Sequence, residues 1–176
     1  MNELLFFRAV LCLVIIGGSG FTGWVLGWSI RERPRQLASL QVALSRLETE
    51  IGYSMAFLPE ALLELARITL PPVNRLFADV AGLLKQGDMS SEAAWKQAVN
   101  RARQYLVLTW DDEQILLGLG GSLGISHRED QTRHLLLARE RLRQQEVAAE
   151  TAKRQLARLY NALGWAAGMA LVLMLA

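Results

Sequence analysis

Residues 125–163 read ISHREDQTRHLLLARERLRQQEVAAETAKRQLARLYNAL, and neither proline nor glycine interrupts them. Apolar side chains recur along this stretch in an approximate heptad, which places them on one side of a helix. They are Leu135, Ala138, Leu142, Ala149, Ala152, Leu156, Leu159 and Leu163, with Gln145 in one core position. The stretch therefore predicts one long amphipathic helix.

The start of this helix is marked by Ser126 and Glu129, which have the spacing of a capping box. The segment just before it, Gly118–Gly124, is rich in glycine and resembles a phosphate-binding loop. It lacks the Lys-Ser/Thr ending of such loops and does not follow a predicted strand. We therefore expect a helix break there and no bound nucleotide.

Both ends of the chain are apolar. No charged residue lies between Ala9 and Ile30, a stretch that as a helix extends roughly 33 Å and matches the ~30 Å hydrocarbon layer of a bilayer. Residues 159–176 are also uncharged and are near the lower length limit for a span. The sequence thus predicts membrane anchors over 1–30 and 159–176, and a domain over 31–158 between them.

The first apolar stretch has two other interpretations. A cleaved signal peptide is disfavoured because the stretch is too long for a typical signal core and has no clear A-x-A site. A lipoprotein signal is disfavoured because Leu11 precedes Cys12, where a small residue is needed. Cys12 is the chain's one cysteine, which excludes an internal disulfide.

The orientation follows from the basic residues that flank the two anchors. Cytoplasmic flanks of membrane segments are enriched in lysine and arginine. The flanking residues here are Arg31, Arg33 and Arg35 after the first anchor, and Lys153, Arg154 and Arg158 before the second. They place the domain in the cytoplasm and both termini outside, although Arg8 favours the opposite arrangement.

The region between the anchors shows helix signals and no strand alternation. A leucine stripe from Leu37 to Leu58 predicts an amphipathic helix that starts near Pro34. Prolines, serines and Thr109 mark further helix starts, and Gly87 marks a helix end. The expected starts are Pro59, the Pro71-Pro72 pair, Ser90 or Ser91, and Thr109 with Asp112 as a capping box. We expect an all-α bundle of about six helices, whose first and last helices pair antiparallel as a stalk.

Catalytic chemistry has few candidates in this chain. Outside the first anchor there is no cysteine, and the two histidines, His127 and His134, could share a helix face with Asp130. A divalent metal there, in a small membrane sensor or enzyme, is an alternative to a solvated helix start. A formal net charge of +2 argues against a nucleic-acid partner. We expect no enzyme activity, cofactor, metal or small-molecule substrate.

Two groups of residues are candidates for contacts. Asp111, Asp112 and Glu113 either complement a helix dipole or dock a partner, and Trp95 and Trp110 either pack in the core or join that surface. In the predicted anchors, Gly23 with Gly27 and Gly164 with Gly168 have the G-x-x-x-G spacing that lets membrane helices pack closely.

Several segments together resemble a known family. They are Glu32–Gln36, Leu47–Ile51, Leu58–Leu62, Leu76-Phe77, the Trp95 helix, Leu123–Ser126 with Gln131, and Leu163-Gly164 with Gly168. In this order, and with two anchors, they resemble the stage III sporulation protein AB family. That family is similar to the cytoplasmic helical domain of the platform proteins of type II secretion and type IV pilus machines.

The resemblance implies a non-catalytic helical bundle in a channel between mother cell and forespore, located in the forespore outer membrane on the mother-cell side. It also implies as partners a secretion-type ATPase, the stage III sporulation protein AA, and other channel subunits, and it leaves open whether copies of the chain form a homo-oligomer. The platform proteins usually have two such domains, whereas this chain has room for one. A coiled-coil membrane adaptor without a secretion role is the alternative that the leucine stripes alone allow.

Overall fold

The computed structural model describes residues 28–52, 57–123 and 127–175, with side chains up to Leu156. These residues form six helices and no strand, which confirms the predicted all-α bundle. The first helix covers residues 28–52. It is followed by α2 (Leu58–Ile68), α3 (Val73–Gln86), α4 (Ser91–Ala102), α5 (Trp110–Gly120) and α6 (Arg128–Leu175).

The helix ends follow the local signals in the sequence. Pro59 lies in the first turn of α2, where its missing amide hydrogen removes no helical bond. Ser90 caps α4 by accepting from the amide of Ala93, and Thr109 and Asp112 form the predicted capping box of α5. After α3, Gly87 adopts φ 76°, a left-handed conformation that glycine takes without strain. Ser126, predicted to cap α6, lies outside the described residues.

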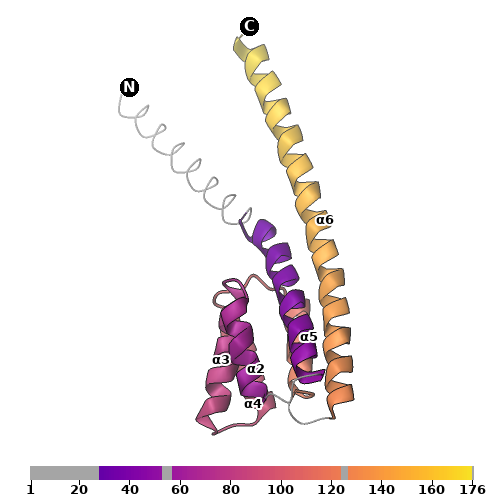
Figure 1. The fold of residues 1–176 in the computed structure, drawn as a ribbon. Helices are drawn as coiled ribbons and strands as arrows, with labels where there is room; N and C mark the ends of the chain where they lie inside the picture. Colours follow the sequence, from indigo (N-terminus) through magenta and orange to yellow (C-terminus); the bar gives the residue numbers. More distant parts are fainter. Residues whose placement is uncertain (1–27, 53–56, 124–126, 176) are drawn as a thin grey trace, which may run out of the picture.

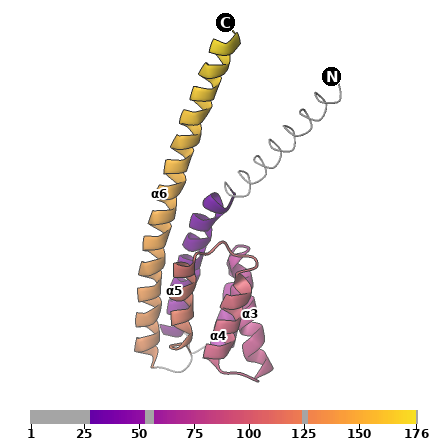
Figure 2. The same cartoon turned by 180° about the vertical axis from the view of Figure 1, so that it is seen from behind.

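The helices run up and down between two ends of the bundle (Figure 1). We call the end where the helix over 28–52 begins the upper end, which also carries loops 69–72 and 103–109. The lower end carries loop 87–90 and the first turns of α2 and α6. Seen from behind in Figure 2, α6 extends far beyond the bundle on the upper side.

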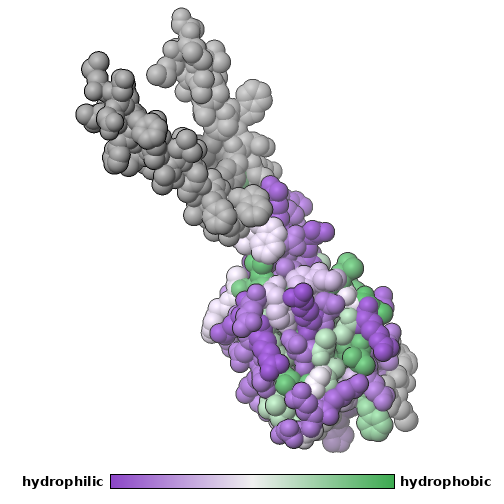
Figure 3. Space-filling model, turned by 90° about the vertical axis from the view of Figure 1, so that its left-hand side faces the viewer, coloured by the Kyte–Doolittle hydropathy of each residue, from purple (hydrophilic) through white to green (hydrophobic). Residues whose placement is uncertain are grey.

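A single hydrophobic core lies between the helices. Trp95 is 1% exposed, packs against Phe77 with ring centroids 6.5 Å apart, and donates its indole N–H to the carbonyl of Leu116 at 2.6 Å. Trp95 therefore joins α3, α4 and α5. On α6 the heptad residues Leu135, Ala138, Leu142 and Ala149 are buried, as predicted, whereas Ala152 is exposed and Leu156 is half-buried. Figure 3 shows one face of the bundle, where hydrophilic residues predominate and hydrophobic ones are scattered.

The helix over 28–52 and α6 form the predicted antiparallel pair. Gln41 donates to Glu146 at 2.7 Å and Arg139 to Glu48 at 2.6 Å. The prediction that a helix begins at Pro34 is wrong, because the helix is already formed from residue 28 and continues through this buried proline. Proline removes one helical hydrogen bond, to the carbonyl of Ile30, and the surrounding packing tolerates that loss.

Both helices also continue without a break across the predicted domain boundaries at 30/31 and 158/159. Within the part of the chain that the structure describes, no helix is long and apolar enough to cross a membrane. The first predicted anchor lies almost wholly outside that part, and the side chains of the second also lie outside it. The two anchors stay predictions.

Candidate functional site: a polar clamp at the upper end

The upper end contains a buried ion pair between the first helix and α5. The guanidinium of Arg33 donates from Nε to Oδ2 of Asp112 at 2.8 Å and from Nη2 to Oδ1 at 3.0 Å. The Asp112 side chain is 0% exposed and that of Arg33 is 18% exposed. This bidentate geometry is the strongest form of arginine–carboxylate contact.

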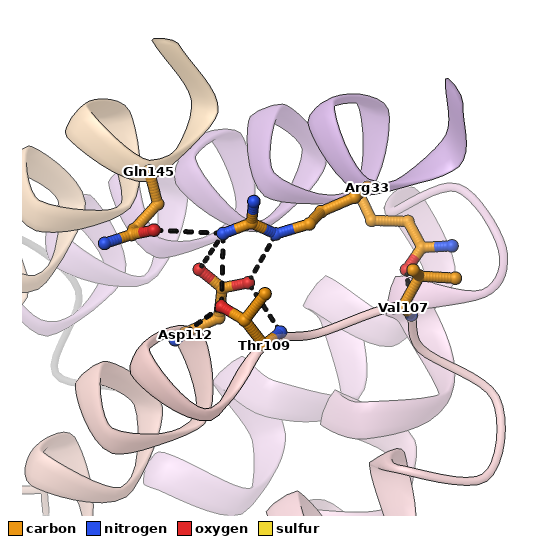
Figure 4. Close-up of polar contacts among 6 residues, drawn as sticks. Arg33, Val107, Thr109, Asp112 and Gln145 are labelled. Carbon is orange, nitrogen blue, oxygen red and sulfur yellow. Dashed lines mark hydrogen bonds and ion pairs between the residues drawn. The ribbon is translucent and has the colours of Figure 1, made fainter. Parts of the chain in front are cut away.

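Two more side chains complete this arrangement, which we call the clamp: Arg33, Thr109, Asp112 and Gln145 (Figure 4). Nη2 of Arg33 also donates to Oγ1 of Thr109 at 3.1 Å and to Oε1 of Gln145 at 2.9 Å. Gln145 belongs to α6, so one guanidinium joins the first helix, α5 and α6. Gln145 is the polar residue of the apolar heptad, and Arg33 is its hydrogen-bond partner.

The α5 capping box holds the carboxylate of Asp112 in place for Arg33. The amide of Thr109 donates to Oδ2 of Asp112 at 2.9 Å, and the amide of Asp112 donates to Oγ1 of Thr109 at 3.4 Å. The positive end of the α5 dipole also favours the ionised carboxylate. Asp112 thus caps its own helix and pairs with another one.

A second polar contact fixes loop 103–109 to the first helix. Gln36 is 3% exposed, and its Oε1 accepts from the amide of Val107 at 2.7 Å. Beside the clamp lies a hollow of about 210 Å³. Its lining comes from both stalk helices and this loop: Ser29, Ile30, Arg33, Val107, Leu108, Thr109, Ala149 and Ala152.

The predicted docking residues do not form one surface. Trp95 and Asp112 are buried with partners inside the chain, and Glu113 is 9% exposed and pairs with Arg103 at 2.7 Å. Trp95 is therefore a core residue, the first of the two roles considered for it. Asp111 and Trp110 are exposed. A docking role remains a prediction for these two residues alone.

The clamp holds three helices in one relative position. One cation on the first helix, hydrogen-bonded to side chains of α5, its N-cap and α6, fixes the two stalk helices to the bundle. Polar networks of this kind specify one geometry when every member is satisfied.

A family model described as Stage III sporulation protein AB matches residues 8–176. The chain belongs to the stage III sporulation protein AB family.

Two known proteins support the assignment. Stage III sporulation protein AB of Bacillus subtilis (strain 168) is 33% identical over 161 residues, which cover 92% of this chain and 94% of that protein. A solved structure of a stage III sporulation protein AB is 35% identical with a TM-score of 0.67, and the match covers 70% of this chain and 98% of that one. The predicted resemblance is confirmed.

Other predicted sites of this stage III sporulation protein AB family member can now be placed. His127, Asp130 and His134 are exposed. Among the described residues, no group of three or more His, Cys, Asp or Glu side chains could hold a metal ion. Gly23 and Gly27 lie outside the described residues, and Gly164 and Gly168 lie in the part of α6 beyond the described side chains. Their packing role stays a prediction.

A tyrosine near the clamp has a shifted pKa. Tyr105 in loop 103–109 donates its hydroxyl to Oδ2 of Asp79 at 2.9 Å, and the guanidinium of Arg75 lies 5.9 Å from its ring centroid. Burial is the main cause that raises the pKa of Tyr105, and the hydrogen bond and negative charge of Asp79 raise it further. Tyr105 thus remains a neutral donor that joins the loop to α3.

Sequence reasoning missed three residues of this region: Arg33, Gln36 and Gln145. From the sequence, Arg33 is predicted as a basic flank of the first anchor and as part of the Glu32–Gln36 segment of the resemblance, and Gln145 as a polar position in the heptad, with no partner named for any of them. The interrupted heptad was the available signal, because a polar core position in paired helices usually has a specific partner. The sequence did not indicate which residue that partner is.

Proposed function

We propose that this chain is a membrane-anchored scaffold, a platform subunit of the sporulation channel between mother cell and forespore. Its two apolar ends lie in the cell membrane, in the forespore outer membrane on the mother-cell side, and its helical bundle lies in the cytoplasm. Membership of the stage III sporulation protein AB family supports the sporulation role. The basic flanks of both ends support the orientation. The role is non-catalytic and acts through contacts.

The clamp is the observation that carries this proposal. The first helix leads to residues 1–27, and α6 leads to the other apolar end. Arg33, on the first helix, binds Asp112 of α5 through a bidentate contact and donates to Gln145 of α6. A displacement of the bundle is therefore passed to both membrane ends together. A scaffold that couples a cytoplasmic motor to a membrane complex needs such a rigid joint.

The lower end is the proposed docking surface for the secretion-type ATPase, the stage III sporulation protein AA. It is the end farthest from the proposed membrane. Among its exposed charged side chains, the acidic residues Glu60, Asp88, Glu129 and Asp130 outnumber the basic residues Lys85 and Arg128. Complementary charge raises association rates and selects among partners. We infer that the ATPase presents a basic surface to this end.

Binding of the purified ATPase to the full chain in lipid nanodiscs tests the proposal. Replacing Glu60 and Asp88 with lysine should weaken binding at least about tenfold, because reversal of a charge at a complementary interface costs several kcal/mol. Asp111→Lys tests the competing docking position, an exposed acidic residue at the upper end, and should bind as the wild type does if docking is at the lower end. If Asp111→Lys alone abolishes binding, docking is at the upper end. If the wild type shows no binding, the ATPase role is refuted.

The coiled-coil adaptor is the weaker alternative. It requires only a two-helix rod, which the first helix and α6 would provide. Four further helices bury a core around Trp95 and Phe77 and pack against that pair. A folded bundle of this size provides a surface that a simple adaptor does not need.

A further inference from the structure

Two large apolar side chains project from the upper end of the bundle. Leu70, in loop 69–72, is 75% exposed, and Trp110, the first residue of α5, is 70% exposed. Single exposed apolar residues are common and need no explanation. These two, however, belong to the same end: Leu70 lies in loop 69–72 and Trp110 directly follows loop 103–109. Both loops lie at the end from which the two stalk helices extend (Figure 1).

Direct contacts hold loop 103–109 to α3, the helix that follows loop 69–72. Arg75, in the first turn of α3, lies over the ring of Tyr105 in loop 103–109, and Tyr105 donates to Asp79 of α3. Loop 103–109 is in turn fixed to the first helix through Val107 and Gln36. The upper end therefore moves as one surface with the stalk.

The charge of this surface is basic. Residues 67–75 and 101–111 contain Arg67, Arg75, Arg101 and Arg103, and Asp111 is their one acidic residue. Arg67 and Arg103 pair with Glu64 and Glu113, at 3.5 and 2.7 Å. Arg75 and Arg101 form no ion pair within the described residues, so their charges are available to an anionic partner. At the lower end, the exposed charged side chains are mostly acidic.

The contacts of Arg33 and Gln36 with loop 103–109 set how far this loop lies from the hydrocarbon layer of the membrane. Ile30 is the last residue of the uncharged stretch, and Arg33 and Gln36, which contact loop 103–109, lie roughly 5 and 9 Å further along the helix axis at about 1.5 Å per residue. The headgroup layer of one leaflet is about 5–8 Å thick. If Ile30 marks the edge of the hydrocarbon, the loops lie within or just beneath the headgroups.

We infer that the upper end of the bundle rests on the anionic cytoplasmic leaflet. Leu70 and Trp110 enter the interfacial layer, and Arg75 and Arg101 lie at the lipid phosphates. Tryptophan is enriched at this depth, and arginine is attracted to the negative surface of an anionic leaflet. This inference rests on the proposed membrane anchoring. It adds that the bundle itself, and not only its ends, contacts lipid.

Site-specific fluorescence quenching tests it in the full chain. Cys12 is replaced by serine, and an environment-sensitive fluorophore is attached at Gln104→Cys, in the upper loop, or at Asp88→Cys, at the lower end. Each protein is reconstituted into vesicles of phosphatidylglycerol and phosphatidylcholine that contain headgroup-level nitroxide lipid. We expect strong quenching at 104 and little at 88. Pure phosphatidylcholine should reduce the quenching at 104.

Variants separate lipid contact from mere proximity. Leu70→Ser with Trp110→Ser should reduce quenching at 104 at least about twofold, because the interfacial anchors are lost. Leu136→Ser, a half-exposed leucine on α6, is the matched control and should have no effect. Equal quenching at 104 and 88 in chains that float with the vesicles overturns this inference alone. Chains that do not float with vesicles overturn the anchoring as well.

A protein partner on the same surface gives a different result. In that case the serine variants leave quenching at 104 unchanged and weaken binding of the ATPase. That outcome also contradicts the lipid contact.

Discussion

Arg33 and Asp112 are 79 positions apart in the chain, yet their side chains meet in a bidentate contact of 2.8 and 3.0 Å. The Asp112 side chain is fully buried there, and that of Arg33 is partly buried. The pair attaches the helix over 28–52 to the first turn of α5. It thereby connects the ends of the chain to the bundle.

Arg33→Met should destabilise the bundle by about 3 kcal/mol, because it leaves the buried carboxylate of Asp112 without its cation. Urea unfolding of the detergent-solubilised full chain, followed by circular dichroism, measures this. Arg35→Met is the control, since Arg35 pairs with Glu32 at the surface and its side chain is 76% exposed. Its loss should cost less than about 0.5 kcal/mol. Equal effects of the two variants would contradict the role of the clamp.

The double variant Arg33→Met with Asp112→Leu should recover part of this loss. Replacing both partners of a buried ion pair with apolar residues is often far less harmful than removing one. The recovery will be incomplete, because Asp112 also caps α5 and the loss of a cap costs about 1 kcal/mol. Strict additivity of the two single effects would show that the residues do not interact.

Two glycines of α5 should respond in opposite ways to alanine. A Cβ at Gly120 would lie 3.1 Å from Cδ1 of Trp95, whereas at Gly118 it would meet nothing within 4 Å. Gly118→Ala should stabilise the protein by about 0.5–1 kcal/mol through helix propensity. Gly120→Ala should destabilise it by about 1 kcal/mol or more, because the core is already filled. Thermal unfolding of both variants checks this. A stabilised Gly120→Ala protein would mean that Trp95 moves aside easily.

Tyr105 should ionise at higher pH than an ordinary tyrosine, whose pKa is 10.0. Because the pKa of Tyr105 is raised in the folded state, its contribution to the free energy of unfolding is complete below about pH 10. This contribution decreases as the pH rises further. The stability difference between wild type and Tyr105→Phe should therefore be constant at neutral pH and shrink above pH 10. Removing the negative charge with Asp79→Asn should lower the pKa of Tyr105.

Ultraviolet titration of tyrosinate, taken as wild type minus Tyr105→Phe, measures this pKa directly. Ionisation near the ordinary value would show that Tyr105 is neither buried nor bonded to Asp79 in solution.

Local signals predicted most of the fold. Prolines and caps predicted the starts of α2, α3, α4 and α5, and Gly87 predicted the end of α3, because these features depend on neighbouring residues. Pro34 was misjudged, because a proline favours a helix start and yet can be accommodated inside a helix when packing compensates for one lost bond. The long helix was found because nothing interrupts its pattern.

The clamp was not predicted, for a physical reason. The capping box with Thr109 already gave Asp112 a role that needs only residues 109–112. The positive-inside rule already gave Arg33 a role that needs only the neighbouring apolar stretch. Their pairing depends on how the first helix packs against α5, which no local pattern contains. Trp95 and Trp110 were equally ambiguous, because an aromatic residue on a helix is compatible with core and surface, and only the packing separates them.

The cytoplasmic location of the bundle is the claim on which the proposed scaffold role depends. Its most direct test is thiol labelling of Asp88→Cys in a Cys12→Ser background, in intact cells and in opened membranes. We expect a membrane-impermeant reagent to label position 88 only after the membrane is opened, with the protein remaining in the membrane fraction. Labelling in intact cells, or a protein found wholly outside that fraction, would contradict the claim.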